Sequence, residues 1–144
     1  MIGSAALKKH SLFGGIAEEQ IDKIIPLMNR ETFNAGDTIL AEGSLNDKIY
    51  FIVEGKVAII KDGTLLCELP EGNTVGEMEV LDVMASAATV KAVTDVAVMS
   101  ISNKSLREIY KNDLKTFSLM VMNLARDLSR RLRFANKQIT GEDE

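Results

Sequence analysis

Hydrophobic and polar residues follow two different periods along this chain, and the change of period marks its organisation. Between residues 16 and 28 the apolar side chains recur at helical spacing among charged ones, which predicts a short amphipathic helix disturbed near Pro26. From Glu31 to Ser102 the chain breaks into short runs rich in Val, Ile, Thr and Phe, separated by glycines. This rhythm is typical of short antiparallel strands.

The strand region predicts its own turns. Residues 49–53 and 57–60 flank Glu54-Gly55, and Asp62-Gly63 precedes a further run at 65–69, so we expect two consecutive hairpins. Two more strands are expected at 87–93 and 96–101. About eight strands in some 70 residues are too many for one flat sheet with a solvent face. We therefore expect a mainly β fold with flanking helices, an eight-stranded antiparallel double-sheet roll of the jelly-roll kind.

Helical spacing returns after the roll. Ser102 or Asn103 can cap a short helix, and Asn112 or Asp113 can cap a long one that runs to about Ile139. Apolar residues recur along the long helix at steps of three and four, close to a coiled-coil seam: Leu114, Phe117, Val121, Leu124, Leu128, Leu132, Ala135 and Ile139. At 1.5 Å per residue this helix is roughly 40 Å long. That exceeds one face of so small a roll, so we expect a homodimer through this helix; the alternative is a helix folded entirely on its own roll.

Length and charge refine this picture. The 144 residues suit one domain over residues 1–140, with the roll at about 31–102, helices at about 103–139 and an acidic tail at 141–144. The formal net charge is −4, yet residues 104–139 hold nine basic and three acidic side chains. A basic segment can indicate nucleic acid, but this one lacks the second helix of a DNA-reading motif, so a solvated helix face is favoured. We expect no DNA-binding module in this chain.

Residue counts exclude several kinds of site. Cys67 is the single cysteine and His10 the single histidine, which rules out a disulfide framework and a Cys/His metal cluster. We expect His10 at the surface and Cys67 as a small buried hydrophobe. Nothing resembles catalytic machinery, so an enzyme is not predicted. No apolar stretch approaches the roughly 20 residues of a membrane span, and the N-terminus has the wrong order for a secretory signal, so a cytoplasmic location is expected.

Several short sequence motifs then occur in a characteristic order. They are Phe33 to Ile39, Glu42-Gly43, Asp47 to Val57, Leu69 to Asn73, Val75-Gly76-Glu77 and Ala87 to Ala92. Each motif alone is unspecific, but their order and spacing together resemble the cyclic nucleotide-binding domain family. The resemblance covers nearly the whole chain. The resemblance implies a β-roll between helical segments, a ligand such as cyclic AMP or cyclic GMP, no other cofactor, and C-terminal helices that respond to the ligand.

The resemblance also implies where the ligand binds, in a loop that opens a short helix. The candidate ligand-binding residues are Gly76, Glu77, Met78, Ser86, Ala87, Ala88 and Thr89. A glycine lets backbone approach the ligand closely, and amides at a helix start can point at an anion. In the family the residue matching Glu77 accepts a hydrogen bond from the ribose 2′-hydroxyl, and those matching Ala87 to Thr89 contact phosphate and base.

One residue departs from the family's pattern. Members that bind nucleotide carry an arginine for the phosphate where this chain has Ser86. The spacing from Glu77 to Ala87 matches that of the family, so shifting the alignment does not recover an arginine. The loop from Gly76 to Ala88 holds three carboxylates and no cation. Lys91 is expected to face away from the loop, and Arg126 or Arg130 of the long helix could supply a cation. Two functions remain open: weak or altered cyclic nucleotide sensing, and a degenerate protein-interaction or dimerisation module.

Overall fold

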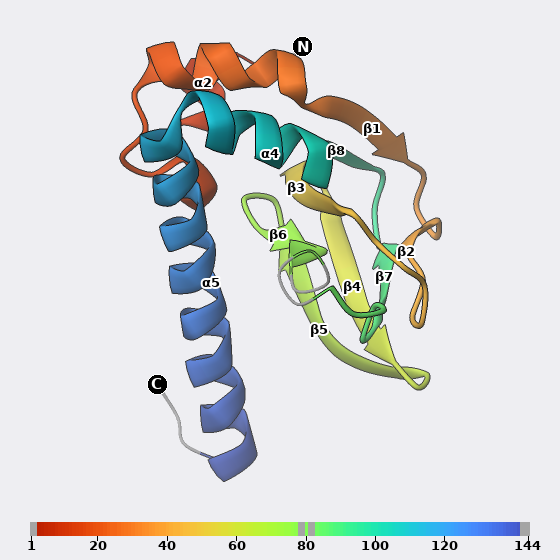
Figure 1. The fold of residues 1–144 in the computed structure, drawn as a ribbon. Coiled ribbons are helices and arrows are strands. Elements are labelled where there is room, and N and C mark those ends of the chain that lie inside the picture. The colour runs from red at the N-terminus through yellow and green to blue at the C-terminus, as the bar shows by residue number, and fades with distance from the viewer. Residues whose placement is uncertain (1–2, 78–79, 81–82, 142–144) are drawn as a thin grey trace.

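The computed structural model describes residues 3–77, 80 and 83–141. The chain begins with short helical pieces: α1 (Ser4–Leu7), η1 (Ser11–Phe13), α2 (Glu18–Ile24) and η2 (Ile25–Leu27). Figure 1 shows them packed across one end of the molecule. The amphipathic helix expected over 16–28 is shorter than its pattern, because Pro26 lacks the amide that would continue the α-helical ladder and lies instead in the first turn of η2.

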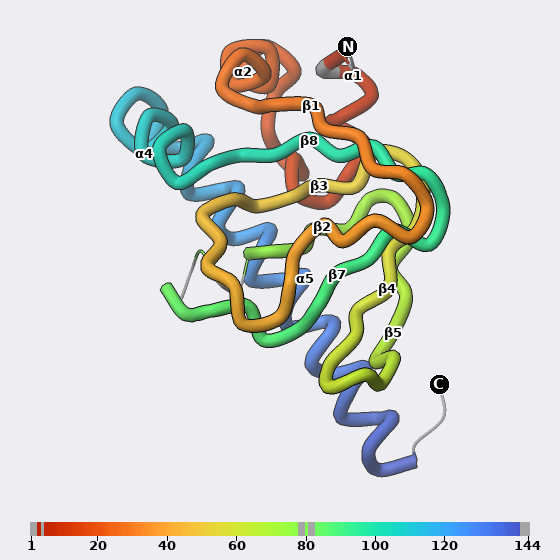
Figure 2. Tube along the Cα trace, turned by 90° about the vertical axis from the view of Figure 1, so that its right-hand side faces the viewer, coloured from red at the N-terminus to blue at the C-terminus, as the bar shows by residue number. Residues whose placement is uncertain are grey.

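Eight strands follow and form two four-stranded antiparallel sheets, as expected for a double-sheet roll. One sheet has the order β1-β8-β3-β6 and the other the order β2-β7-β4-β5. The strands are β1 (Asn29–Phe33), β2 (Thr38–Leu40), β3 (Lys48–Glu54), β4 (Lys56–Lys61), β5 (Thr64–Pro70), β6 (Thr74–Val75), β7 (Thr89–Ala92) and β8 (Val96–Ser102). In Figure 2 the two sheets lie face to face, with the long C-terminal helix passing behind them.

The first expected hairpin is wrong and the second is confirmed. β3 pairs with β6 and β8, whereas β4 pairs with β5 and β7, so the chain changes sheet at Gly55. Gly55 has a φ of +92°, and a Cβ there would lie 2.3 Å from the carbonyl oxygen of Asp95. The glycine thus serves a tight crossover between sheets. Asp62 and Gly63, with φ of 49° and 77°, do form the turn of the β4–β5 hairpin.

The core has two parts, one on each side of the sheet that contains β3. Ile52 and its neighbours fill the space between the sheets, together with Val57, Val75, Val90 and Val98. Phe51 points the other way, into a cluster with Phe13, Met99, Ile109 and Met120 that joins the roll to the helices. Because alternate side chains of β3 enter different cores, the strand reads as a continuous apolar run.

Two single residues lie differently from expectation. His10 is half-buried, with its ring 4.5 Å from that of Phe51, because η1 packs against the roll; this burial lowers the pKa of His10. Cys67 is exposed, because β5 is an edge strand with exposed side chains along most of its length. Tyr50 and Phe51 are both buried.

Two helices close the chain: α4 (Asn103–Asn112) and α5 (Leu114–Thr140). Both predicted caps are present, since Ser102 accepts a hydrogen bond from the Ser105 amide and Asp113 from the Thr116 amide, each at 3.1 Å. The hydrogen bonds to Thr116 lower the pKa of Asp113. Figure 1 shows α5 running along one side of the roll toward the C-terminus. Among the described residues, no helix is both long enough and apolar enough to cross a membrane.

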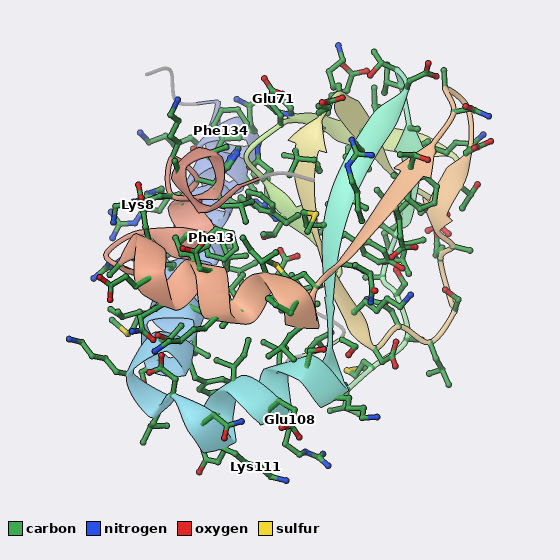
Figure 3. The ribbon with its side chains drawn as sticks, turned by 90° about the horizontal axis from the view of Figure 1, so that it is seen from above. Lys8, Phe13, Glu71, Glu108, Lys111 and Phe134 are labelled. Carbon is green, nitrogen blue, oxygen red and sulfur yellow. The ribbon has the colours of Figure 1, made fainter. Side chains whose placement is uncertain are left out.

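α5 meets the rest of the chain along one face. Met120 and Leu124 are buried. The side-chain nitrogen Nδ2 of Asn123 donates to the carbonyl oxygens of Leu12 at 2.9 Å and Gly14 at 3.0 Å. One turn further on, Ser11 Oγ donates to Asp127 at 2.7 Å. Figure 3 shows the N-terminal helices and the α4–α5 region lying side by side at this end of the molecule. α5 is therefore fixed to η1 before it reaches the loop that follows β6.

Candidate functional site

The loop between β6 and β7 starts at a glycine that the structure requires. Gly76 is buried with a φ of +84°, and a Cβ there would lie 2.7 Å from both Asn46 Nδ2 and the Lys48 carbonyl oxygen. Asn46 Nδ2 donates to that same carbonyl at 2.7 Å and to the Gly76 carbonyl at 3.2 Å. Asn46 thus holds the start of the loop against β3. A side chain at position 76 would break this arrangement.

The next residue, Glu77, is bound by a cation from α5. Glu77 is 2% exposed, and its Oε1 accepts from Arg131 Nη1 at 2.8 Å. Arg131 Nη2 also donates to the carbonyl oxygen of Thr74, the first residue of β6, at 2.7 Å. The side chain of Arg131 is 29% exposed, so the ion pair is partly shielded from water. This contact joins residues 54 apart in the sequence and connects the loop to the C-terminal helix.

Arg131 is not the arginine that the sequence suggested. Arg126 is exposed, and Arg130 forms an exposed pair with Asp127 at 3.0 Å. Positions 123, 127 and 131 are successive steps of four on one helix face, and the polar contacts of Asn123 and Asp127 fix which face that is. The apolar stripe alone does not reveal it, because Asn123 looks like a solvent-facing residue in the sequence. The polar residues Asn123, Asp127 and Arg131 indicate this helix face only once their partners elsewhere in the chain are known.

Ser86 lies at the other end of the loop and is fixed on all sides. It is 4% exposed, its amide donates to the Ser44 carbonyl, and its carbonyl accepts from the Gly43 amide, both at 2.8 Å. Its hydroxyl donates to the carbonyl oxygen of Ala88 at 2.7 Å. The position at which the resemblance led us to expect an arginine therefore holds a buried hydroxyl that bonds within the loop.

Ala87 and Thr89 are bonded to β4 and to the segment that follows β2. The Ala87 carbonyl accepts from Lys61 Nζ at 2.9 Å, and Lys61 Nζ also lies 3.9 Å from a carboxylate oxygen of Glu42. Thr89 Oγ1 accepts from the Glu42 amide at 3.0 Å, while Ala88 is half-buried. Sequence reasoning missed Lys61, which lies 26 residues before Ala87 and reaches it only because β4 pairs with β7.

Some expectations about the loop can be followed only in part. Lys91 is exposed between the buried Val90 and Ala92, so its side chain faces away from the core between the sheets. Met78, Glu79 and Asp82 lie outside the described residues. The structure therefore places six of the seven candidate residues: Gly76 and Glu77 at the α5 end, and Ser86 to Thr89 near β4 and the segment that follows β2.

This arrangement has the donors and acceptors for a small polar ligand. At one end of the loop Glu77 supplies a carboxylate acceptor, and Arg131 supplies guanidinium donors. Arg131 and Lys61 each bring positive charge to one end of a loop whose own sequence is acidic. The site can therefore hold a hydroxyl group and an anion together, and one of its cations belongs to a helix.

Comparisons with known proteins concern the family and the fold of this chain. A family model described as cyclic nucleotide-binding domain matches residues 30–113. The cyclic AMP receptor protein of Thermus thermophilus is 30% identical over 138 residues, which cover 92% of this chain and 62% of the relative. The cGMP-dependent protein kinase egl-4 of Caenorhabditis elegans is 30% identical over 91 residues, covering 63% of this chain and 12% of the kinase. The chain thus spans less than two thirds of either relative.

Solved structures share the fold over nearly the whole chain. A crystal structure of a cyclic nucleotide-binding domain from Methylobacillus flagellatus superposes with a TM-score of 0.87 at 23% identity, covering 97% of this chain and 82% of the other. The Thermus thermophilus catabolite activator protein superposes with a TM-score of 0.77 at 28% identity, covering 90% of this chain and 62% of the other. At 23% identity, the likeness to the Methylobacillus flagellatus structure concerns the fold alone.

Proposed function

Because the chain belongs to the cyclic nucleotide-binding domain family, we propose that it is a regulatory, non-catalytic domain of the cytoplasm that binds cyclic AMP or cyclic GMP in the loop from Gly76 to Thr89. Glu77 accepts the ribose hydroxyl, and backbone of the loop approaches the phosphate at Gly76 and Ala87. The observation that supports this most is the Arg131–Glu77 ion pair. It connects the residue that would hold the ligand to the helix that would report on it.

Binding in this proposal is weak. Ser86 offers one neutral hydroxyl in place of a guanidinium, and that hydroxyl already bonds to Ala88. A hydrogen bond to a charged group contributes about 1.5–3 kcal/mol, and about 1.4 kcal/mol is a tenfold change in affinity. The ligand must also compete with the hydrogen bond from Ser86 to Ala88 within the loop. We therefore expect affinity in the micromolar range at best.

The signal would leave the site through α5. A ligand that binds better when Arg131 is docked on Glu77 favours the docked position of the helix, and so shifts the population of α5 positions without any chemical step. Asn123 and Asp127 would carry the same shift to η1, because they lie on the same face as Arg131. A partner that recognises α5 or the N-terminal helices would detect the change.

A second function is favoured by one observation. The amide, carbonyl and hydroxyl of Ser86 all form hydrogen bonds within the chain. Ser86 therefore needs no ligand to satisfy its polar groups. On this alternative the domain is a protein-interaction or dimerisation module that has lost nucleotide binding. The two functions differ in one measurable property, the response of the loop to added nucleotide.

Titration of the wild-type chain with cyclic AMP and cyclic GMP, followed by NMR, tests the proposed function. We expect saturable shifts at Gly76, Glu77 and Ser86 to Thr89, and in α5 near Arg131, with a micromolar dissociation constant. AMP, which has a doubly charged open phosphate in place of the ring, serves as the control ligand and should bind less well. The absence of shifts at millimolar cyclic nucleotide would favour the interaction module instead.

We further propose that the chain forms a homodimer through α5. The second half of the predicted seam is not covered by this chain, since Leu132 is 62% and Ile139 is 82% exposed. A second copy presents the same apolar stripe and can cover both residues at once. Sedimentation equilibrium should find a dimer for the wild type and a monomer for the L132E/I139E variant. Leu45→Glu, at a leucine that is 87% exposed and far from α5 in the sequence, should remain a dimer; a monomeric wild type would contradict the proposal.

A further inference from the structure

The loop itself offers an anion no positive side chain. Residues 76–89 contain three carboxylates and no lysine or arginine. Ser86, at the position of the family's arginine, is buried and its hydroxyl donates to the Ala88 carbonyl. A singly charged cyclic phosphate would therefore meet net negative charge from the loop. Any cation that balances it has to come from another element of the fold.

Two cations reach the described part of the loop from outside. Lys61 of β4 donates to the Ala87 carbonyl at 2.9 Å, and its side chain is 48% exposed. Arg131 of α5 donates to Glu77 at 2.8 Å, and its side chain is 29% exposed. The two therefore bind opposite ends of the loop. Which of them lies beside the phosphate depends on how the ligand is built.

The chemistry of the ligand favours Arg131. In a 3′,5′-cyclic nucleotide the phosphate is bonded to O3′, on the carbon next to the one that carries the 2′-hydroxyl. A group bound to the acceptor of the 2′-hydroxyl therefore lies beside the phosphate, and Arg131 is bound to Glu77. The guanidinium has five N–H donors, of which the bonds to Glu77 and Thr74 use two. Its planar fork suits phosphate oxygens better than an ammonium, and its lower exposure reduces screening.

Resting on the proposed function, we infer that Arg131 supplies from α5 the positive charge that the loop lacks at Ser86. The cation of the site thus belongs to the responding helix rather than to the loop. Binding then requires α5 to be docked, and docking is favoured by the ligand to the same extent, since coupling between two equilibria is reciprocal. A loop with its own arginine would bind nucleotide whatever the position of the helix.

The experiment compares cyclic AMP dissociation constants by isothermal titration calorimetry for the wild type and for R131M, R130M, K61M, S86R and the double variant S86R/R131M. Losing one charge-assisted contact should make R131M weaker by about tenfold or more. Arg130→Met is the matched control: it removes the neighbouring arginine, whose side chain is 69% exposed and pairs with Asp127, and should bind like the wild type. The double variant should recover at least wild-type affinity, because the loop then has its own cation.

Hydrogen exchange adds a readout that a merely structural role would not move. Cyclic AMP should slow amide exchange in α5 near Arg131 of the wild type, whereas the double variant should bind without protecting the helix. Wild-type affinity in R131M would overturn the inference, and so would a loss of binding in K61M that R131M does not share. Failure of both the wild type and S86R to bind would instead overturn the proposed function on which the inference rests.

Discussion

Replacing Ser86 by arginine should raise the affinity for cyclic AMP roughly ten- to hundredfold, since a charge-assisted hydrogen bond contributes about 1.5–3 kcal/mol. The backbone needed to present the new side chain is already fixed, because the Gly43 amide donates to the carbonyl of residue 86 and the Ser44 carbonyl accepts from its amide. The guanidinium would replace a hydroxyl bonded to Ala88 and place its donors at the phosphate. Calorimetric titration of both proteins measures the ratio directly.

The control for Ser86→Arg is Ala85→Arg, one residue earlier at an exposed position. It adds the same charge to the same loop without aiming it at the ligand, so its gain should be small at physiological salt. Circular dichroism verifies that each variant is folded. Nanomolar binding by the wild type, or equal gains from the two arginines, would show that position 86 does not limit affinity.

Replacing Gly76 by alanine should cost about 2–5 kcal/mol of folding free energy, from strain at a positive φ together with overpacking. The new Cβ would meet the Lys48 carbonyl and Asn46 Nδ2 at 2.7 Å, and the Asn46 bridge to the loop would be lost. Glu77 would then be displaced, so cyclic nucleotide binding should be lost as well. Urea denaturation followed by circular dichroism measures the loss of stability.

Gly63→Ala separates the two causes of that loss. Gly63 has a φ of +77°, similar to Gly76, but nothing lies within 4 Å of an added Cβ. Its variant should therefore lose only the strain contribution, about 1–2 kcal/mol, and keep its ligand affinity. If the two variants were equally destabilised, the contact with Lys48 would not be the reason that position 76 is glycine.

The sequence predicted the elements of this fold better than their pairing. The short strands, the Asp62-Gly63 turn and the caps at Ser102 and Asp113 all follow from local chemistry, and all are present. The hairpin expected at Gly55 is wrong, because a glycine between two strands marks a tight change of direction whether or not the strands pair. A crossover differs from a hairpin in which strands pair on either side of the glycine, and that pairing is not local.

The same limit applies to the site. The resemblance to the family suggested Gly76, Glu77 and the segment from Ser86 as candidates, because the loop is continuous in sequence. The cations that serve it are distant: Lys61 reaches Ala87 through the pairing of β4 with β7, and Arg131 reaches Glu77 through the packing of α5. Periodicity predicted the length of α5 well, but it could not choose among Arg126, Arg130 and Arg131. The polar bonds of Asn123 and Asp127 make that choice.

A crystal structure of the wild-type chain grown with saturating cyclic AMP tests the central claim most directly. The account predicts nucleotide density between Glu77 and Ser86, with the ribose 2′-hydroxyl on Glu77 and a phosphate oxygen within hydrogen-bonding distance of Arg131. A loop without nucleotide at saturating concentration, or a phosphate whose charge is balanced without Arg131, would contradict it.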